Sequence, residues 1–133
     1  NLIIEDFIPF ADVMPFADAF VTNGGYGDVM LAIENMLPMV AAGVHEGKDE
    51  ICARIGYFQY GINLKTETPR ADQIKKSVER ETANPVYKSN VQKLCQELAG
   101  YRPNDLFQKA VNRILAAEDS YRQTVIQPEE LIF

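Results

Sequence analysis

The sequence predicts an α/β fold, with a parallel sheet flanked by helices, that closes with a run of helices. Two observations predict this class. Between residues 19 and 64, short runs of strand-forming residues alternate with segments whose apolar residues recur at helical spacing. From residue 68 onward, the periodic segments have helical spacing and begin or end at Pro, Asn or Gly. Because strands alternate with helices, the connections favour right-handed crossovers and a parallel sheet.

The first two segments are expected to be a strand and a short helix. Residues 1–7 begin with an apolar run that favours a strand, and Pro9 ends it. Residues 11–17 favour a short helical turn, which Pro15 interrupts. The chain begins with Asn rather than Met, so we expect it to be a piece of a longer protein.

The central unit of the chain, residues 19–43, combines a strand, a glycine turn, a helix and a second strand. Residues 19–22 form the first strand, and a helix with one apolar face follows from Tyr26. Pro38 ends this helix, and residues 39–42 form a second, buried strand.

The glycine turn at residues 23–25 joins the first strand to the helix. Such a turn leaves N–H groups free where the helix dipole adds partial positive charge, so it predicts an anion site, most often for phosphate. Gly24, Gly25 and Gly27 match neither the dinucleotide fingerprint nor the P-loop pattern. From the turn alone, a tight connection that binds nothing is an equal alternative.

The next segments continue the alternation. A polar loop at residues 44–49 follows the second strand and therefore lies on the same rim of the sheet as the glycine turn. Residues 50–58 form a helix and residues 61–64 a third strand. Thr68 is expected to cap the following helix, with Pro69 at its first position.

Helices complete the chain. Asn84 and Pro85 open a helix over residues 86–99, which a glycine ends. A further helix covers residues 104–117. Residues 123–133 have no clear period, and their apolar side chains are expected to dock on another part of the protein, such as a missing partner domain.

Composition narrows the classes of function. The 133 residues, 47% of them hydrophobic, are enough for one domain with a buried core. The formal net charge is −6, and no run of Lys and Arg alternates with aromatic residues, so no nucleic-acid partner is expected. No apolar segment is long enough to span a membrane, and we expect no signal peptide. Cys52 and Cys95 form no CxxC pair, which favours free thiols and a cytoplasmic location.

Six short segments occur in an order that carries a family resemblance: DFIP at 6–9, VMPFAD at 13–18, FVTNGG at 20–25, PMV at 38–40, ARI at 53–55 and GINL at 61–64. They are similar to segments written D-W-x-P-Q, V-L-P-H-A-D, F-V-T-H-G-G, P-M-V, A-x-R-I and G-x-G-x-x-L. From residue 1 to about residue 114, the chain resembles the C-terminal, donor-binding half of family 1 UDP-dependent glycosyltransferases of the two-Rossmann-domain (GT-B) type. This family includes plant secondary-metabolite and bacterial macrolide glycosyltransferases.

The resemblance implies a Rossmann-like sheet, with residues 1–133 as the C-terminal nucleotide-sugar donor-binding domain of a GT-B glycosyltransferase. The full-length protein would transfer a hexose from a nucleotide diphosphate sugar, with UDP as the expected nucleotide, to a hydroxyl acceptor. The N-terminal acceptor-binding domain, which carries the catalytic base in this family, is absent, so the chain alone is expected to be inactive. No metal or other cofactor is required, and no ligand cluster has zinc-like spacing.

The resemblance also implies where the donor binds. Phe7 would stack on the base, and the backbone around Ile8 would hydrogen-bond it. The diphosphate would be held by Asn23, Gly24, Gly25, Tyr26, Gly27 and Asp28. The donor sugar would face Glu46, Gly47, Lys48 and Asp49.

Several positions depart from the family pattern. Asn23 replaces the usual His, and it can donate a hydrogen bond but carries no charge. Asp28 replaces a Ser or Thr on the phosphate, and its carboxylate would repel a diphosphate. Leu31 replaces the usual ribose-binding Glu, and Gly47-Lys48 replaces an Asp/Glu-Gln pair, where Lys48 could supply the missing cation.

These departures keep other classes of function open. The first alternative is a catalytically silent nucleotide-sugar-binding domain of the same fold. The second is a nucleotide-sugar epimerase-like domain of the same architecture.

Overall fold

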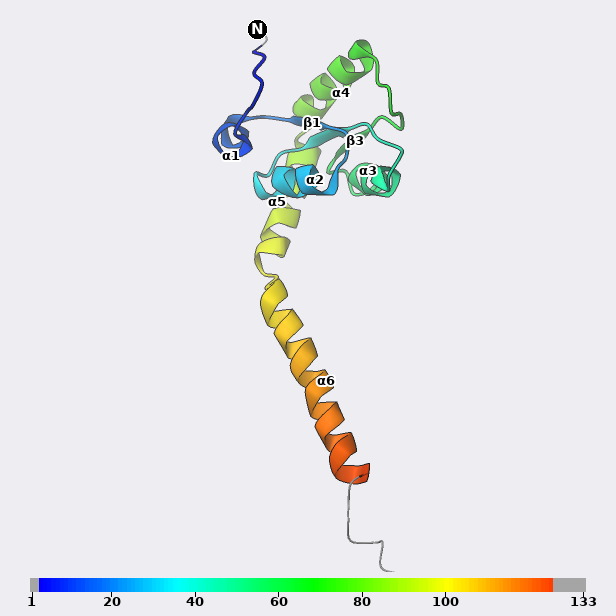
Figure 1. Ribbon diagram of the computed structural model, residues 1–133. Helices are drawn as coiled ribbons and strands as arrows, with labels where there is room; N and C mark the ends of the chain where they lie inside the picture. The colour runs from blue at the N-terminus through cyan, green and yellow to red at the C-terminus, as the bar shows by residue number, and fades with distance from the viewer. Residues whose placement is uncertain (1–2, 126–133) are drawn as a thin grey trace, which may run out of the picture. The chain divides into compact units, whose positions relative to one another are not determined.

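The computed structural model describes residues 3–125, with side chains described as far as residue 118 (Figure 1). The chain divides into two compact units, residues 1–98 and residues 99–133, and each is described by itself. The strands that the structure describes all belong to the first unit.

A three-stranded parallel sheet forms the centre of the first unit. Its strands, in spatial order, are β1 (Phe20–Thr22), β2 (Met39–Ala41) and β3 (Gly61–Asn63). Met39 lies opposite Phe20 on one side and opposite Gly61 on the other, so the three strands are in step. The expected α/β fold with a parallel sheet is therefore confirmed.

Helices lie before, between and after the strands. They are α1 (Phe10–Val13), the 3-10 helix η1 (Met14–Phe16), α2 (Tyr26–Glu34), α3 (Lys48–Tyr57), α4 (Ala71–Ala83) and α5 (Pro85–Ala99). The two crossovers between strands contain α2 and α3, as the alternating pattern predicted. Figure 1 shows α2 and α3 on one face of the sheet and α4 on the other, so both faces are covered.

The core lies between one face of β2 and the helices α2, α3 and α5. Met39 and Ala41 are fully buried, and Val40 between them is buried on the opposite face. The helical residues that pack into the same cluster include Val29, Ala32, Ile33, Cys52, Ile55 and Val91. Each large apolar side chain buried here contributes about 1.5–3 kcal/mol of transfer free energy.

The helix that begins at Pro85 forms as predicted. The Asn84 side-chain oxygen accepts a hydrogen bond from the Val86 N–H at 3.1 Å, which caps the helix start. Along the helix, Val91 is buried and Leu94 and Leu98 pack against the core. Capping and a single apolar stripe therefore agree on where α5 starts and which face it buries.

The predicted strand at the N-terminus is wrong for the described residues. Residues 3–9 are irregular, and Ile3 and Ile4 are 78% and 81% exposed. A strand needs a neighbour for its backbone N–H and C=O groups, and no ladder of the described part includes this segment. The short helical turn that follows is confirmed as α1 and η1, with Pro15 inside η1.

Two predicted helix starts are shifted. The second crossover helix begins at Lys48 rather than residue 50, directly after Gly47 in the left-handed conformation. The following helix begins at Ala71, not at Thr68-Pro69, because the Gln73 side chain accepts a hydrogen bond from the Arg70 N–H at 2.9 Å.

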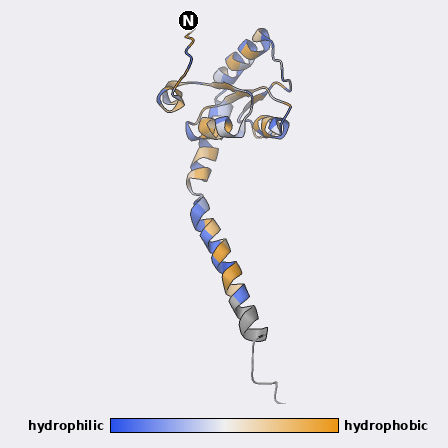
Figure 2. Cartoon of the chain, in the orientation of Figure 1, coloured by the Kyte–Doolittle hydropathy of each residue, from blue (hydrophilic) through white to orange (hydrophobic). Residues whose placement is uncertain are grey.

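The second unit contains α6 (Pro103–Val125), which is longer than the predicted helix over residues 104–117. Figure 2 shows polar and apolar residues alternating along it, and Phe107 and Ile114 are 72% and 67% exposed. Residues 126–133, where part of the aperiodic tail was predicted, lie outside the described residues. Among the helices that the structure describes, none is both long enough and apolar enough to cross a bilayer.

Candidate functional site

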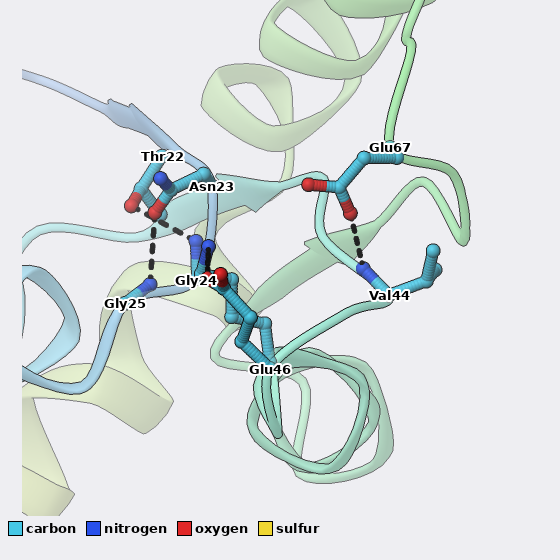
Figure 3. A network of polar contacts seen from close by, with 8 residues as sticks. Thr22, Asn23, Gly24, Gly25, Val44, Glu46 and Glu67 are labelled. Carbon is cyan, nitrogen blue, oxygen red and sulfur yellow. Dashed lines mark hydrogen bonds and ion pairs between the residues drawn. The ribbon is translucent and has the colours of Figure 1, made fainter.

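Three connections meet at one edge of the sheet. Because the strands are parallel, the segments that leave their carboxyl ends share a rim: residues 23–25 after β1, 42–47 after β2 and 64–70 after β3. The predicted glycine turn and the predicted sugar-facing loop are therefore neighbours, as expected. Figure 3 shows residues from all three connections in one view.

The glycine turn packs against the second connection without room for side chains. Gly24 has a φ of +79° and is buried, and a Cβ added to it would overlap the Sγ atom of Cys52. A Cβ added to Gly43 would overlap the carbonyl oxygen of Asn23. Glycines at these two positions let the backbones of the first two connections approach each other closely.

Side-chain oxygens cap the N–H groups of the turn. The Gly24 N–H donates to Thr22 Oγ1 at 3.1 Å, and the Gly25 N–H donates to Asn23 Oδ1 at 3.0 Å (Figure 3). Thr22 Oγ1 in turn lies 3.4 Å from Asp28 Oδ2. The turn is thus preformed, with two oxygen atoms placed on its backbone donors.

The start of α2 adds further donors. Its N-cap is Gly25, which has no side chain to satisfy the first turn. The N–H groups of Tyr26, Gly27 and Asp28 therefore have no carbonyl partner within the helix, and Tyr26 is 71% exposed. The helix dipole places partial positive charge here, and the Asp28 carboxylate in the first turn partly offsets it.

The first residue of α3, Lys48, lies beside the turn. Its Cβ lies 3.9 Å from the position that a Cβ on Gly24 would take, and its side chain is 20% exposed. The Nζ atom forms an ion pair with Glu46 Oε2 at 2.9 Å. This hydrogen bond raises the pKa of Lys48 and lowers the pKa of Glu46. The predicted loop residues Glu46 and Lys48 are therefore brought together, with the ammonium held by a carboxylate.

Backbone geometry shapes the loop that carries this pair. Glu46 and Gly47 have φ values of 58° and 78°, two left-handed residues in succession. The Lys48 N–H donates to the His45 carbonyl at 3.0 Å, which closes the turn before α3. Asp49 follows in the first turn of α3, where a carboxylate interacts favourably with the helix dipole.

The third connection contributes Glu67, which the sequence reasoning missed. Its Oε2 atom accepts a hydrogen bond from the Val44 N–H at 2.8 Å (Figure 3). Thr22 and Cys52 were also missed. A Thr directly before Asn-Gly-Gly is a signal for a capped turn, whereas nothing local in the sequence marks Cys52 or Glu67 as neighbours of the site.

The predicted base-binding residues lie apart from this network. Phe7 and Ile8 belong to the irregular segment before α1, and they are 82% and 38% exposed. Within the described part of the chain, no hydrogen bond or ring contact joins them to residues 23–28. Their placement neither assembles nor blocks a base-stacking site.

Two cavities of the first unit lie beside its helices and strands, and Tyr26 of the predicted site lines one of them. One cavity, of about 400 Å³, lies between α2 and α3 and is lined by residues such as Met30, Ile51 and Phe58. Another, of about 450 Å³, lies beside β3. Neither is lined by residues 23–25. Within the described residues, no three His, Cys, Asp or Glu side chains are grouped so that they could hold a metal ion.

Comparison with known proteins gives a consistent picture. Residues 1–113 match the family described as erythromycin biosynthesis protein CIII-like, C-terminal domain. UDP-glycosyltransferase 2 of Phaeomoniella chlamydospora is 37% identical over 114 residues, which are 86% of this chain and 24% of that protein. UDP-glucosyltransferase 1 of Beauveria bassiana (strain ARSEF 2860) is 36% identical over 111 residues, 84% of this chain and 24% of that protein.

Two further proteins extend the comparison. The 4'-demethylrebeccamycin synthase of Lentzea aerocolonigenes is 34% identical over 99 residues, 74% of this chain and 24% of that protein. The crystal structure of the kitacinnamycin glycotransferase superposes with a TM-score of 0.70 at 22% identity, covering 78% of this chain and 28% of that one. This likeness confirms the expected Rossmann-like fold. The chain spans about a quarter of the length of the curated relatives it matches.

Proposed function

Because the chain belongs to the erythromycin biosynthesis protein CIII-like C-terminal domain family of glycosyltransferases, we propose that it is the donor-binding half of such an enzyme. The full-length protein would transfer a hexose from a nucleotide diphosphate sugar, with UDP as its nucleotide, to a hydroxyl acceptor. The observation that carries the proposal is the preformed glycine turn at residues 23–25, set beside the free N–H groups that begin α2.

Main-chain donors would hold the diphosphate. A diphosphate at this turn would take the positions of the Asn23 side-chain oxygen on Gly25 and of solvent on the first turn of α2. During transfer, negative charge gathers on the leaving diphosphate as the anomeric carbon becomes positive. Fixed N–H dipoles aimed at that charge stabilise the transition state without reorganising.

Lys48 would provide the positive charge that Asn23 lacks. Its Cβ lies next to the turn at the start of α3, and its ammonium is paired with Glu46, so the donor would have to compete with that carboxylate. Gly47 and Asp49, on either side of Lys48, would complete the sugar-facing wall. Phe7 and Ile8 would contact the base once their segment folds against the turn.

The catalytic base and the acceptor site would come from another part of the protein. The relatives are about four times as long as the segment they share with this chain and their remaining length could hold an N-terminal acceptor domain. We therefore expect no transfer by the 133-residue chain alone. Turnover of a UDP-sugar by this chain with a hydroxyl acceptor would contradict that assignment.

The catalytically silent domain stays the second candidate. Asp28 beside the turn and Leu31 in place of a ribose-binding carboxylate favour it, because both weaken donor recognition. No observation favours the epimerase-like alternative.

Two experiments test the proposal. A thermal-shift titration of the chain with UDP, TDP and GDP should raise the unfolding temperature most with UDP, since a ligand that binds only the folded state stabilises it. No shift with any of the three would overturn donor binding. Transfer by the full-length protein, assayed with and without EDTA, then separates an active enzyme from a silent one. We propose equal rates in both conditions, because dipoles and Lys48 would take the role of a metal ion.

We also propose that the protein is located in the cytoplasm. Cys52 and Cys95 are both free thiols, which supports the reducing environment of the cytoplasm.

A further inference from the structure

Glu67 joins two of the connections at the proposed donor site. It lies after β3, and its Oε2 atom accepts the Val44 N–H of the β2–α3 connection at 2.8 Å. Within residues 3–118, no other side-chain hydrogen bond links two of the connections that leave the carboxyl ends of the strands. A carboxylate acceptor makes a backbone hydrogen bond about twice as strong as a neutral one.

The loop held by this bond needs support. Just beyond Val44 the backbone passes through two left-handed residues, Glu46 and Gly47, and left-handed geometry is unfavourable for a residue with a side chain. Lys48 follows, packed near Gly24 and Gly43. An anchor at Val44 therefore fixes the start of the segment that places Lys48.

The charge of Glu67 also acts at this position. Its carboxylate is one of the groups that raise the pKa of Lys48, after the direct partner Glu46. The carboxylate of Glu67 therefore stabilises the charged form of Lys48 without forming an ion pair with it, because the hydrogen-bonded partner of Lys48 is Glu46.

We propose that Glu67 is a positioning residue for the donor: by holding the Val44 N–H, it keeps the β2–α3 loop and Lys48 beside the glycine turn. This inference rests on the proposed donor-binding function. In this proposal Glu67 acts through Val44 and does not contact the donor. Its acceptor oxygen therefore matters more for donor binding than its negative charge.

Two substitutions separate these properties. Glu67→Ala removes the acceptor, and Glu67→Gln keeps a side-chain oxygen at the same reach but removes the charge. Glu79→Ala is the matched control, because this exposed carboxylate lies in α4, 3.9 Å from Lys75. Isothermal titration of the 133-residue chain with UDP gives the dissociation constant for each variant, and circular dichroism shows that each is folded.

We expect Glu67→Ala to weaken UDP binding about tenfold, with Glu67→Gln and Glu79→Ala within about threefold of the parent chain. Amide exchange at Val44 should become faster in Glu67→Ala and remain slow in Glu67→Gln. If Glu67→Gln loses affinity as severely as Glu67→Ala, the charge of Glu67 and not its hydrogen bond to Val44 supports binding, and the positioning role is wrong. If Glu67→Ala binds UDP as well as the parent chain, the inference fails alone. If the parent chain binds no UDP, the proposed function fails with it.

Discussion

Cys52 lies directly beneath Gly24, so closely that a methyl group on Gly24 would overlap its Sγ atom. The thiol is fully buried, and burial raises its pKa, so it stays neutral under the turn. The distance between the turn and α3 thus depends on two residues: a glycine at position 24 and a small, uncharged side chain at position 52.

Substituting Gly24 with Ala should destabilise the domain by about 3 kcal/mol. The new side chain would both adopt a left-handed φ of +79° and overlap Cys52. Urea unfolding measures the loss, and Gly27→Ala is the control because nothing lies within 4 Å of a Cβ there. Adding Cys52→Ala should restore part of the stability, and strictly additive effects of the two substitutions would contradict the packing argument.

Replacing Asp28 with Ser should tighten UDP binding about fivefold. The carboxylate lies in the first turn of α2, 3.4 Å from Thr22 Oγ1. Its removal takes away one negative charge that would repel the diphosphate. Titration calorimetry at two salt concentrations tests this, because the gain should shrink as salt screens the charges. Asp28→Asn should behave similarly. An unchanged or weaker affinity in both variants would show that a diphosphate does not approach this carboxylate.

Glu81 should make the domain less stable as the pH rises. This carboxyl group is 1% exposed, neither oxygen has a hydrogen-bond partner, and burial raises its pKa to about 8 from an ordinary value of 4.5. The folded state binds the Glu81 proton more tightly than the unfolded state does. The contribution of this proton to the free energy of unfolding is therefore complete below pH 4.5 and is lost as the pH rises to about 8. Between pH 5.5 and pH 8 the free energy of unfolding should fall by up to about 3 kcal/mol.

The matched variants for this prediction lie in one helix. Glu81→Gln should remove the decrease, whereas Glu79→Gln, on the exposed side of α4, should retain it. Urea unfolding at the two pH values measures both. An equal pH dependence in parent and Glu81→Gln would place the titrating group elsewhere.

Removing the cap of α5 should cost about 1 kcal/mol. Asn84→Ala deletes the oxygen that accepts the Val86 N–H at 3.1 Å and leaves that donor to solvent. The unfolding temperature should fall by a few degrees. Asn84→Ser retains an acceptor at the same position and should stay close to the parent chain. A similar fall in both variants would mean that the side chain acts through something other than capping.

Apart from the start of α3, the elements of residues 19–63 were predictable because local pattern and tertiary structure agree there. The apolar runs of β1 and β2 and the glycine turn between β1 and α2 each mark a boundary on their own. The apolar run at Ile3 and Ile4 carries the same local signal, yet it has no partner strand in the described part of the chain and does not form one. Local pattern therefore predicts a strand only where the sheet offers it a neighbour.

The parts of the candidate site that could be predicted are those formed by residues close together in sequence. The turn from Asn23 to Gly25 and the pair Glu46 and Lys48 involve contacts over two residues. Contacts of Gly24 with Cys52 and of Val44 with Glu67 join segments more than 20 residues apart in sequence, and only the folded chain reveals them. The start of α4 was misplaced for a different reason, because two local hydrogen bonds compete with the expected cap. The Thr68 N–H donates to Thr66 Oγ1, and the Arg70 N–H donates to Gln73 Oε1, so the helix begins only at Ala71.

The side-chain oxygens of Thr22 and Asn23 already accept hydrogen bonds from the backbone N–H groups of the two turn glycines. An arriving pyrophosphate would therefore replace these acceptors rather than add new hydrogen bonds there. The number of hydrogen bonds on the turn would stay the same, but each charged oxygen would make a stronger bond than the neutral oxygen it replaces. The gain from each exchange is therefore the difference between two bonds and not the full strength of a new one, and a calorimeter would measure the heat released.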